Sequence, residues 1–267
     1  MRIRVTSKTE TGRVRSQNED SLLVRPDLRD NSIRETEESL EVDTEQALFA
    51  VADGMGGSVA GEVASDLAIG SFGEIIHSKG IRPDATEEEV RELIDRLVAF
   101  SQVTMFERSE WTPEVEGMGS TLVMGMIRNG GLHVAWVGDS RCYLHRQGDL
   151  LRCLTKDHSH VQELVDNGSI DPEDAFGHPH SNVITRAIIC EYGTDPTPDH
   201  FDCDLKAGDR LLFCSDGLND MLRDREIEEI LETEEDPDSC VQRLVAEANG
   251  KGGRDNITVI LVDVVAL

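Results

Sequence analysis

Two short apolar segments of this 267-residue sequence run directly into an Asp-Gly pair. Residues 47–52 precede Asp53-Gly54, and residues 211–215 precede Asp216-Gly217. Each pattern predicts a buried strand that delivers a carboxylate at its end, followed by a glycine that allows close backbone approach. Because strand ends hold side chains more rigidly than loops do, the chain is expected to fold around fixed carboxylates.

A third aspartate, Asp255, stands at the start of the last predicted strand, after the glycine-rich residues 250–253. Several carboxylates brought together repel one another unless a cation compensates them. Oxygen-only ligands of this kind suit Mg²⁺ or Mn²⁺ rather than zinc. Asp-Gly is also the commonest turn dipeptide, so any one pair alone is more often an ordinary turn.

The remaining pattern predicts groups of strands separated by pairs of helices. Strands are expected at residues 1–8, 21–25, 201–205, 210–215 and 256–265, and helices at 60–76, 90–105, 224–232 and 239–249. A Thr86-x-x-Glu89 capping box precedes the second helix. Residues 119–154 alternate apolar runs with glycine-containing turns and predict a meander. This order favours two packed sheets with helices outside them, in one domain over residues 1–267.

The formal charge is −27, from 53 acidic and 26 basic side chains. A charge of this sign argues against nucleic acid or an anionic membrane surface as a partner. Most of the excess is expected to be a solvated surface, and the alternative is that part of it holds cations. Residues 26–46 contain eight carboxylates and two arginines, and they predict an acidic surface insertion.

The six cysteines form no CxxC pair, and most of them lie in apolar runs. They predict reduced, buried thiols in a cytosolic protein. The first residues, MRIRVTSKTETG, contain no apolar signal core, and no apolar run approaches the roughly 18 residues of a membrane span. We therefore expect a soluble, cytoplasmic protein.

Five segments, in this order, resemble the metal-dependent serine/threonine phosphatases of the protein phosphatase 2C family in its bacterial form. They are VRSQNED at 14–20, VADGMGG at 51–57, VGDSR at 137–141, CSDGL at 214–218 and GRDNIT at 253–258. Weaker similarity is found in GST at 119–121, DHS at 157–159 and NVITR at 182–186. Each motif alone is weak, but five in one order across nearly the whole chain are specific.

The resemblance implies an α+β fold, a four-layer αββα sandwich in which two stacked antiparallel sheets are flanked by helix pairs. It implies a single catalytic domain that hydrolyses phosphoserine and phosphothreonine in proteins. Residues 159–190 correspond in position to the family's flap, which lies beside the site and influences substrate choice. The implied partners are a serine/threonine kinase, which the enzyme would oppose, and that kinase's substrates; the implied state is a monomer.

The resemblance also implies a metal centre, carried over one residue at a time. Asp53 would bridge two Mn²⁺ or Mg²⁺ ions, and the Gly54 carbonyl would bind one of them. Asp216 and Asp255 would hold the other ion.

Three further residues would surround this centre. Asp20 would stabilise the centre through metal-bound water. Asp139 resembles the ligand of a weaker third ion. Arg15 would bind the substrate phosphate. A water held between two cations gives a hydroxide at neutral pH. That hydroxide would attack phosphorus in line, while the cations and Arg15 stabilise charge on the phosphate oxygens.

Two positions depart from the wider family pattern. Met55 stands where eukaryotic relatives carry a histidine proposed as the leaving group's acid, although bacterial relatives generally share the methionine. Ser58 stands where many bacterial members have a histidine. His158 is either a residue near the substrate or one that satisfies a turn. His178 and His180 resemble a zinc pair only superficially, because no third ligand is near them in sequence.

Three other functions stay open at this point. A pseudophosphatase should lack one of the three core aspartates, and all are present. An enzyme of the same fold could act on a small phosphate ester, which turnover of a phosphothreonine peptide would distinguish. A calcium-binding acidic protein should show Asp-x-Asp-x-Asp-Gly loops, which are absent.

Overall fold

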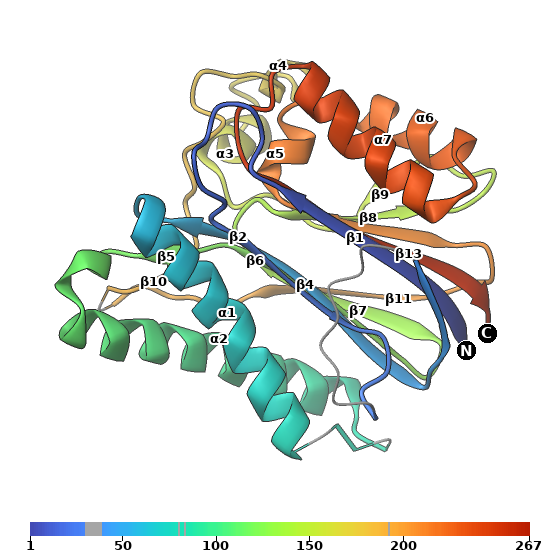
Figure 1. The fold of residues 1–267 in the computed structure, drawn as a ribbon, viewed down its shortest axis with the longest axis horizontal. Helices are drawn as coiled ribbons and strands as arrows, with labels where there is room; N and C mark the ends of the chain where they lie inside the picture. Colours follow the sequence, from blue (N-terminus) through green and yellow to red (C-terminus); the bar gives the residue numbers. More distant parts are fainter. Residues whose placement is uncertain (30–38, 80, 83, 192) are drawn as a thin grey trace.

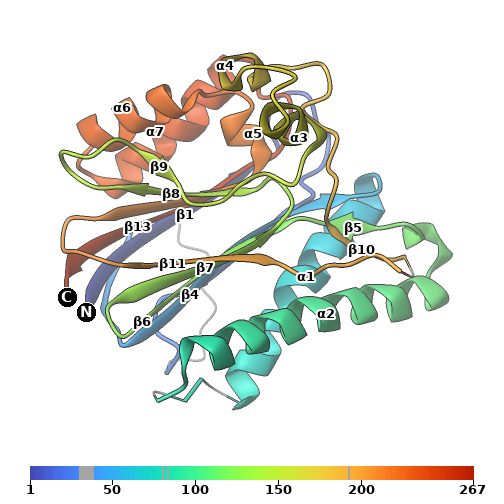
Figure 2. The same cartoon turned by 180° about the vertical axis from the view of Figure 1, so that it is seen from behind.

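The computed structural model of the chain stacks two antiparallel β-sheets, with helices on both outer sides (Figure 1). It describes residues 1–29, 39–79, 81–82, 84–191 and 193–267. Figure 2 shows the same arrangement from behind, with α1 and α2 covering one sheet and α6 and α7 covering the other. The expected α+β, four-layer αββα sandwich is confirmed.

The first sheet has six strands in the order β3-β1-β13-β12-β8-β9. Their bounds are β3 Leu40–Asp43, β1 Arg2–Glu10, β13 Ile257–Ala266, β12 Arg210–Cys214, β8 Arg141–His145 and β9 Arg152–Cys153. Helices α6 (Asp224–Thr233) and α7 (Pro237–Gly250) pack on its outer face. Strands β1 and β13 pair along their whole lengths, so segments from both ends of the chain lie side by side in the middle of this sheet.

The second sheet has seven strands, six of them in the order β10-β5-β4-β6-β7-β11, with β2 paired to β4. Their bounds are β10 Ile188–Ile189, β5 Gly119–Ser120, β4 Gln46–Met55, β6 Leu122–Arg128, β7 Gly131–Val137, β11 Asp199–Asp204 and β2 Asp20–Arg25. Helices α1 (Ser58–Lys79) and α2 (Glu87–Trp111) cover its outer face. The capping box at the start of α2 is confirmed: Thr86 Oγ1 accepts from Glu89 N at 3.2 Å, and Glu89 Oε2 accepts from Thr86 N at 2.8 Å.

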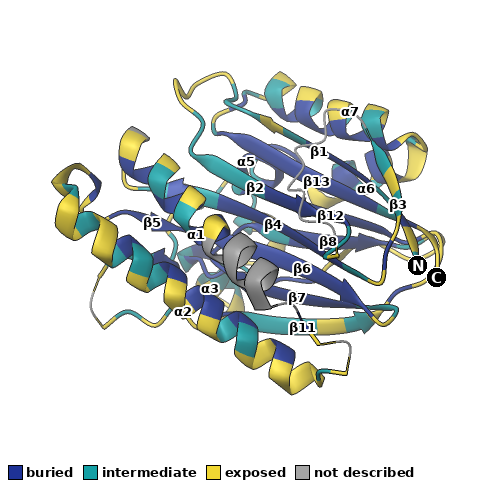
Figure 3. Ribbon diagram, turned by 60° about the horizontal axis from the view of Figure 1, so that its bottom comes forward, coloured by how far each residue is buried: buried dark blue, intermediate teal, exposed yellow. Residues whose placement is uncertain are grey.

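Apolar side chains fill the space between the sheets and under both helix pairs. In Figure 3 the strands are largely buried, and the helices expose only their outward faces. Phe49 of β4 and Phe213 of β12 meet between the sheets with ring centroids 6.1 Å apart. Alternate residues of each strand face a helix layer, which is why the strands are apolar on both faces.

One prediction about the strands is wrong. Residues 119–154 do not form one meander: β6 and β7 make a hairpin, but β8 crosses to the other sheet and pairs with β12. The free edge of β7 is taken by β11, which arrives from much later in the sequence. The acidic insertion also contains a strand, since β3 pairs with β1; residues 30–38 of the insertion lie outside the described residues.

Short elements complete the chain. They are η1 (Pro113–Val115), α3 (His160–Asp166), α4 (Pro172–Ala175) and α5 (Asp216–Asn219). Within the described residues, every helix is too short or too polar to cross a membrane.

The close packing of the two sheets predicts that a side chain at Gly125 of β6 destabilises the fold. A Cβ added there would lie 2.3 Å from Cζ of the buried Phe213 ring. We expect Gly125→Ala to lower the free energy of unfolding by about 1–3 kcal/mol, as overpacking does in cores. Gly70→Ala in α1 is the matched control, because a Cβ there meets nothing within 4 Å and alanine favours helix by about 1 kcal/mol. Urea denaturation measures both, and equal stability of Gly125→Ala and wild type would contradict the packing.

Candidate metal centre

Five aspartates converge on one end of the sandwich from both sheets. Asp20 begins β2 and is paired in register with Asp53 of β4. Asp216 begins α5 directly after β12, and Asp255 stands just before β13. Asp139 lies in the connection by which the chain crosses from β7 to β8. The predicted carboxylates, which are spread over more than 230 positions of sequence, are therefore neighbours in space.

The charge of each carboxylate raises the pKa of its neighbours, which shows that these side chains lie close together. Burial raises the pKa of Asp53 well above its ordinary value, and the charges of Asp20, Asp139 and Asp255 raise it further. Burial likewise raises the pKa of Asp216, and Asp53 and Asp139 add to the effect. Without a compensating cation, the protonated forms of Asp53 and Asp216 are therefore favoured.

The same cause acts on the two aspartates beside this pair. Burial raises the pKa of Asp20 to about 6, although hydrogen bonds from Thr258 and Ser215 oppose the rise. Burial and the charges of Asp157 and Asp220 raise the pKa of Asp139 to about 7.

Three buried carboxylate oxygens have no hydrogen-bond partner in the described part of the chain. They are Oδ1 of Asp20, Oδ1 of Asp139 and Oδ1 of Asp216. Buried polar atoms are normally satisfied, so these three oxygens need an explanation, and a bound ion is one of the standard explanations. A set of carboxylate oxygens from several strands fits a hard divalent cation such as Mg²⁺ or Mn²⁺.

Thr121 fixes the backbone of Asp53. Its Oγ1 accepts from Asp53 N at 3.0 Å, and its N donates to Asp53 O at 2.9 Å. The Thr121 hydroxyl also shares a 2.8 Å hydrogen bond with Ser140, next to Asp139. The segment at 119–121 therefore links the aspartate of β4 to that of the β7–β8 connection.

The close approaches expected at the two Asp-Gly pairs are present. A Cβ on Gly54 would lie 2.0 Å from the carbonyl oxygen of Gly61 in α1. A Cβ on Gly217 would lie 1.9 Å from the carbonyl oxygen of Asn256. Neither position could carry a larger residue without moving backbone, and this explains why glycine follows each aspartate.

Arg15 lies at the rim of the centre, with about half of its side chain exposed. Its Nη2 donates to Asp255 Oδ2 at 2.6 Å. The loop that carries it is held by Asn256, whose Oδ1 accepts from Glu19 N at 2.8 Å and whose Nδ2 donates to Gln17 O at 2.9 Å. Asn256 was not assigned a role from the sequence, although it stands inside the last quoted motif.

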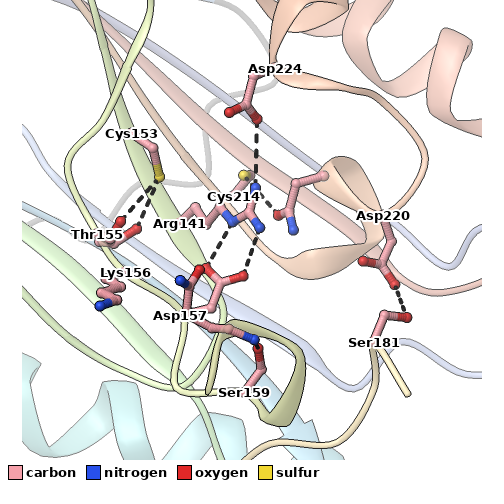
Figure 4. Close-up of polar contacts among 12 residues, drawn as sticks. Arg141, Cys153, Thr155, Lys156, Asp157, Ser159, Ser181, Cys214, Asp220 and Asp224 are labelled. Carbon is pink, nitrogen blue, oxygen red and sulfur yellow. Dashed lines mark hydrogen bonds and ion pairs between the residues drawn. The ribbon is translucent and has the colours of Figure 1, made fainter. Parts of the chain in front are cut away.

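Sequence reasoning missed a sixth carboxylate, Asp220. It lies four residues after Asp216, and its charge raises the pKa of both Asp139 and Asp216. The spacing of one helical turn could have indicated it. Figure 4 shows Asp220 accepting a 3.5 Å hydrogen bond from Ser181 of the 159–190 segment.

A cavity of about 350 Å³ lies between the centre and residues 159–190, with Asp139 and Asp220 among its lining residues. Arg141, also in its wall, donates to both oxygens of Asp157 at 2.8 and 2.7 Å (Figure 4). Residues of the 159–190 segment therefore line the same cavity as Asp139 and Asp220.

His158 supports a turn. Its Nδ1 accepts from Gly138 N at 3.0 Å, and its backbone N donates to Gly138 O at 2.9 Å. It thereby holds the residue before Asp139, at the positive φ of 108° that Gly138 adopts. His180 N donates to His178 Nδ1 at 3.2 Å. The three-ligand group with metal-binding spacing found among the described residues lies elsewhere, on α2, β7 and β11.

Comparison with known proteins gives a consistent result. Residues 29–255 match the family described as protein phosphatase 2C. Over 258 residues the chain is 36% identical to the serine/threonine phosphatase stp of Listeria innocua, covering 96% of this chain and 94% of that one.

Solved structures agree. The S. agalactiae serine/threonine phosphatase superposes with a TM-score of 0.83 at 32% identity, covering 98% of this chain and 99% of that one. The catalytic domain of the serine threonine protein phosphatase PstP, in complex with 2 manganese ions, has a TM-score of 0.77 at 33% identity. That match covers 99% of this chain and 100% of that one.

The raised pKa of Asp139 predicts how the metal-free protein responds to pH. Between the ordinary pKa of 3.8 and about 7, the unfolded chain releases this proton and the folded chain keeps it. Raising the pH through that window therefore lowers the free energy of unfolding. Asp139→Asn removes the ionisation, so in EDTA we expect it to be more stable than wild type near about pH 7.5 and similar near about pH 4. Urea denaturation across this range measures the difference, and parallel curves would contradict it.

Proposed function

The chain belongs to the protein phosphatase 2C family, and from that premise we propose that it is a metal-dependent protein serine/threonine phosphatase. The observation that carries the proposal is the group of buried aspartates at the ends of two sheets, three of whose oxygens lack a hydrogen-bond partner among the described residues. The manganese complex of the similar PstP catalytic domain supports the choice of ion.

The proposed ligands divide into a core pair of sites and a weaker third. Asp53 and the Gly54 carbonyl would hold one ion, and Asp216 and Asp255, together with Asp53, would hold a second. When bound, Mn²⁺ or Mg²⁺ would acidify a water molecule and neutralise charge on the phosphate.

Two further carboxylates lie beside the core pair. Asp139 is the proposed ligand of the third ion, with Asp220 close enough to share it. Asp20 stands at the edge, where Ser215 Oγ donates to its Oδ2 at 2.7 Å and fixes its orientation.

Arg15 is the proposed phosphate-binding residue. Its planar guanidinium can donate to two phosphate oxygens at once and stays charged at any working pH. Its contact with Asp255 places it against the core carboxylates, and its exposure leaves it open to a substrate arriving from solvent. Arg15 would therefore bind the phosphate at the rim of the aspartate centre, on the side of Asp255.

We also propose that residues 1–267 act as one catalytic domain, with residues 159–190 as a flap over the cavity. The Arg223 guanidinium lies 4.1 Å from the ring centroid of Phe176, and Ser181 contacts Asp220, so the segment rests on the α5–α6 region. Opposition to a serine/threonine kinase, with phosphorylated proteins as partners and a monomeric state, is part of the same proposal. The six free cysteines support a cytoplasmic location.

Loss of a core ligand should abolish turnover. We expect Asp216→Asn to lower kcat/KM for a phosphothreonine peptide by at least about 1,000-fold, near 4 kcal/mol of transition-state stabilisation. Asp149→Asn, at an exposed turn, is the matched control and should retain activity. The metal-free wild type should be folded but inactive, with Mn²⁺ or Mg²⁺ restoring turnover. Hydrolysis that survives excess chelator would exclude the metal-dependent mechanism.

The phosphate contact gives a second test. Arg15→Ala should lower kcat/KM by roughly 10- to 1,000-fold, the range for one lost charge-assisted contact. Metal affinity and thermal stability should hardly change. Arg15→Lys should recover only part of the loss, because an ammonium restores charge without the two-point geometry. Arg13→Ala, two residues away and also exposed, is the control. Normal turnover by a destabilised Arg15→Ala protein would make the residue structural.

A further inference from the structure

A second group of metal-ligating side chains lies on the outer face of the seven-stranded sheet. His133 of β7 is paired in register with Asp202 of the edge strand β11. Its strand neighbours Leu132 and Val134 face the space between the sheets, so His133 points to the opposite, helix-covered side. Helix α2 crosses this side (Figure 2) and brings Glu87 to the pair. His133 lies toward the hairpin end of β7, while Asp139 follows the other end.

The ligand atoms of these three residues converge. One carboxylate oxygen each from Glu87 and Asp202 and a ring nitrogen of His133 all lie within 4.8 Å of one another. At bond lengths of about 2.0–2.2 Å, an ion requires His133 Nδ1 and Asp202 Oδ1 to move apart from their hydrogen-bond contact and Glu87 to move toward them. Glu87 is exposed, at the first residue of α2, and is the ligand that can move.

A hydrogen-bond chain through this group is short of one proton. Asp202 Oδ1 contacts His133 Nδ1, His133 Nε2 lies 3.1 Å from His200 Nδ1, and His200 Nε2 lies 2.9 Å from Asp95 Oδ1. Each of these three contacts needs one proton. The carboxylates at both ends only accept, and two neutral imidazoles supply two N–H groups. The chain must therefore carry either an additional proton or a cation at one of its contacts.

A metal ion at Asp202 and His133 satisfies the whole chain. With Nδ1 of His133 bound to the ion, its Nε2–H donates to His200, whose Nε2–H donates to Asp95. Both imidazoles are then neutral, and the ligand histidine donates its second N–H to a fixed acceptor, as metal-bound histidines usually do. The alternative is an imidazolium, which would place a positive charge on a ring that is only 2% exposed.

The surrounding charges leave room for a cation. Glu87, Asp95 and Asp202 contribute three negative charges. Arg128, which donates to Glu87 Oε1 at 2.9 Å, and Arg91, which pairs with Asp202, contribute two positive charges. With neutral histidines the group carries a net charge of −1. Each arginine also orients the carboxylate that it contacts, as groups around metal ligands commonly do.

We propose that Glu87, His133 and Asp202 form a binding site for a divalent transition-metal ion of the Zn²⁺ type, separate from the aspartate centre. One imidazole and two carboxylates suit Zn²⁺, whereas Mg²⁺ favours oxygen ligands alone. The ion would join the first turn of α2 to β11, the strand at the edge of its sheet. The inference does not depend on the phosphatase mechanism.

The test is Zn²⁺ binding by the full chain in excess Mg²⁺, which occupies the oxygen-ligand centre. Wild type should bind one more Zn²⁺ per chain than His133→Gln by equilibrium dialysis, and Zn²⁺ should raise the Tm of wild type but not of this variant. His180→Gln, which removes an exposed histidine outside the group, should behave as wild type. Phosphatase activity of His133→Gln with Mn²⁺ should stay within about twofold of wild type, since no ligand of the aspartate centre changes.

Glu87→Gln provides the second variant, because an exposed residue can be changed without repacking the core. It should weaken Zn²⁺ binding by at least about tenfold. Equal Zn²⁺ stoichiometry and affinity in wild type and both variants would overturn the proposal. So would a wild type that takes up no additional Zn²⁺ while ¹⁵N NMR shows a doubly protonated His133 or His200 at neutral pH, since the missing positive charge would then be a proton.

Discussion

The structure is organised around the cost of burying several carboxylates together. Asp53 and Asp216 are held in an environment that raises the pKa of each, and Asp20, Asp139 and Asp255 increase the repulsion. No arrangement of apolar side chains would tolerate these charges. Arg15, at the rim, donates its hydrogen bond to Asp255. The surrounding structure must therefore hold these carboxylates in place until divalent ions compensate their charge.

The scaffold does this through hydrogen bonds to the residues next to the aspartates. Thr121 fixes the backbone of Asp53 and contacts Ser140, Ser215 orients Asp20, and Asn256 holds the loop of Arg15. These partners come from both sheets, so the position of each carboxylate depends on the stacking of one sheet on the other. The proposed site of Glu87, His133 and Asp202 has a different character, because it contains a nitrogen ligand and lies between a helix and an edge strand. Two sites of such different ligand chemistry would select different ions from the same solution.

Much of the fold could be predicted from local patterns. Apolar runs ending in Asp-Gly gave the strands that lead to Asp53 and Asp216, and Thr86 with Glu89 marked the start of α2 correctly. The crossing of β8 to the other sheet could not be predicted, because the partners of β7 and β8 are β11 and β12, strands that lie much later in the sequence. The same holds for the site. Motifs indicated which aspartates matter, whereas Asp220 and the pairing of His133 with Asp202 depend on a short helix and on a strand register that single residues do not determine.

The pairing of β1 with β13 has a consequence for biosynthesis. The two strands pair from Arg2 with Ala266 to Glu10 with Ile257, with one register shift between Arg2 and Ile3, in the interior of the six-stranded sheet. During translation β1 emerges first, and β3 can pair with one of its edges soon afterwards. The strand that pairs with its other edge, β13, is delivered some 250 residues later, a delay of tens of seconds at typical elongation rates. Asp255 arrives with that partner, so the carboxylate group is completed only when the sheet closes. A nascent chain therefore passes through synthesis as an inactive species, with the β13 edge of β1 available to chaperones and to misfolding.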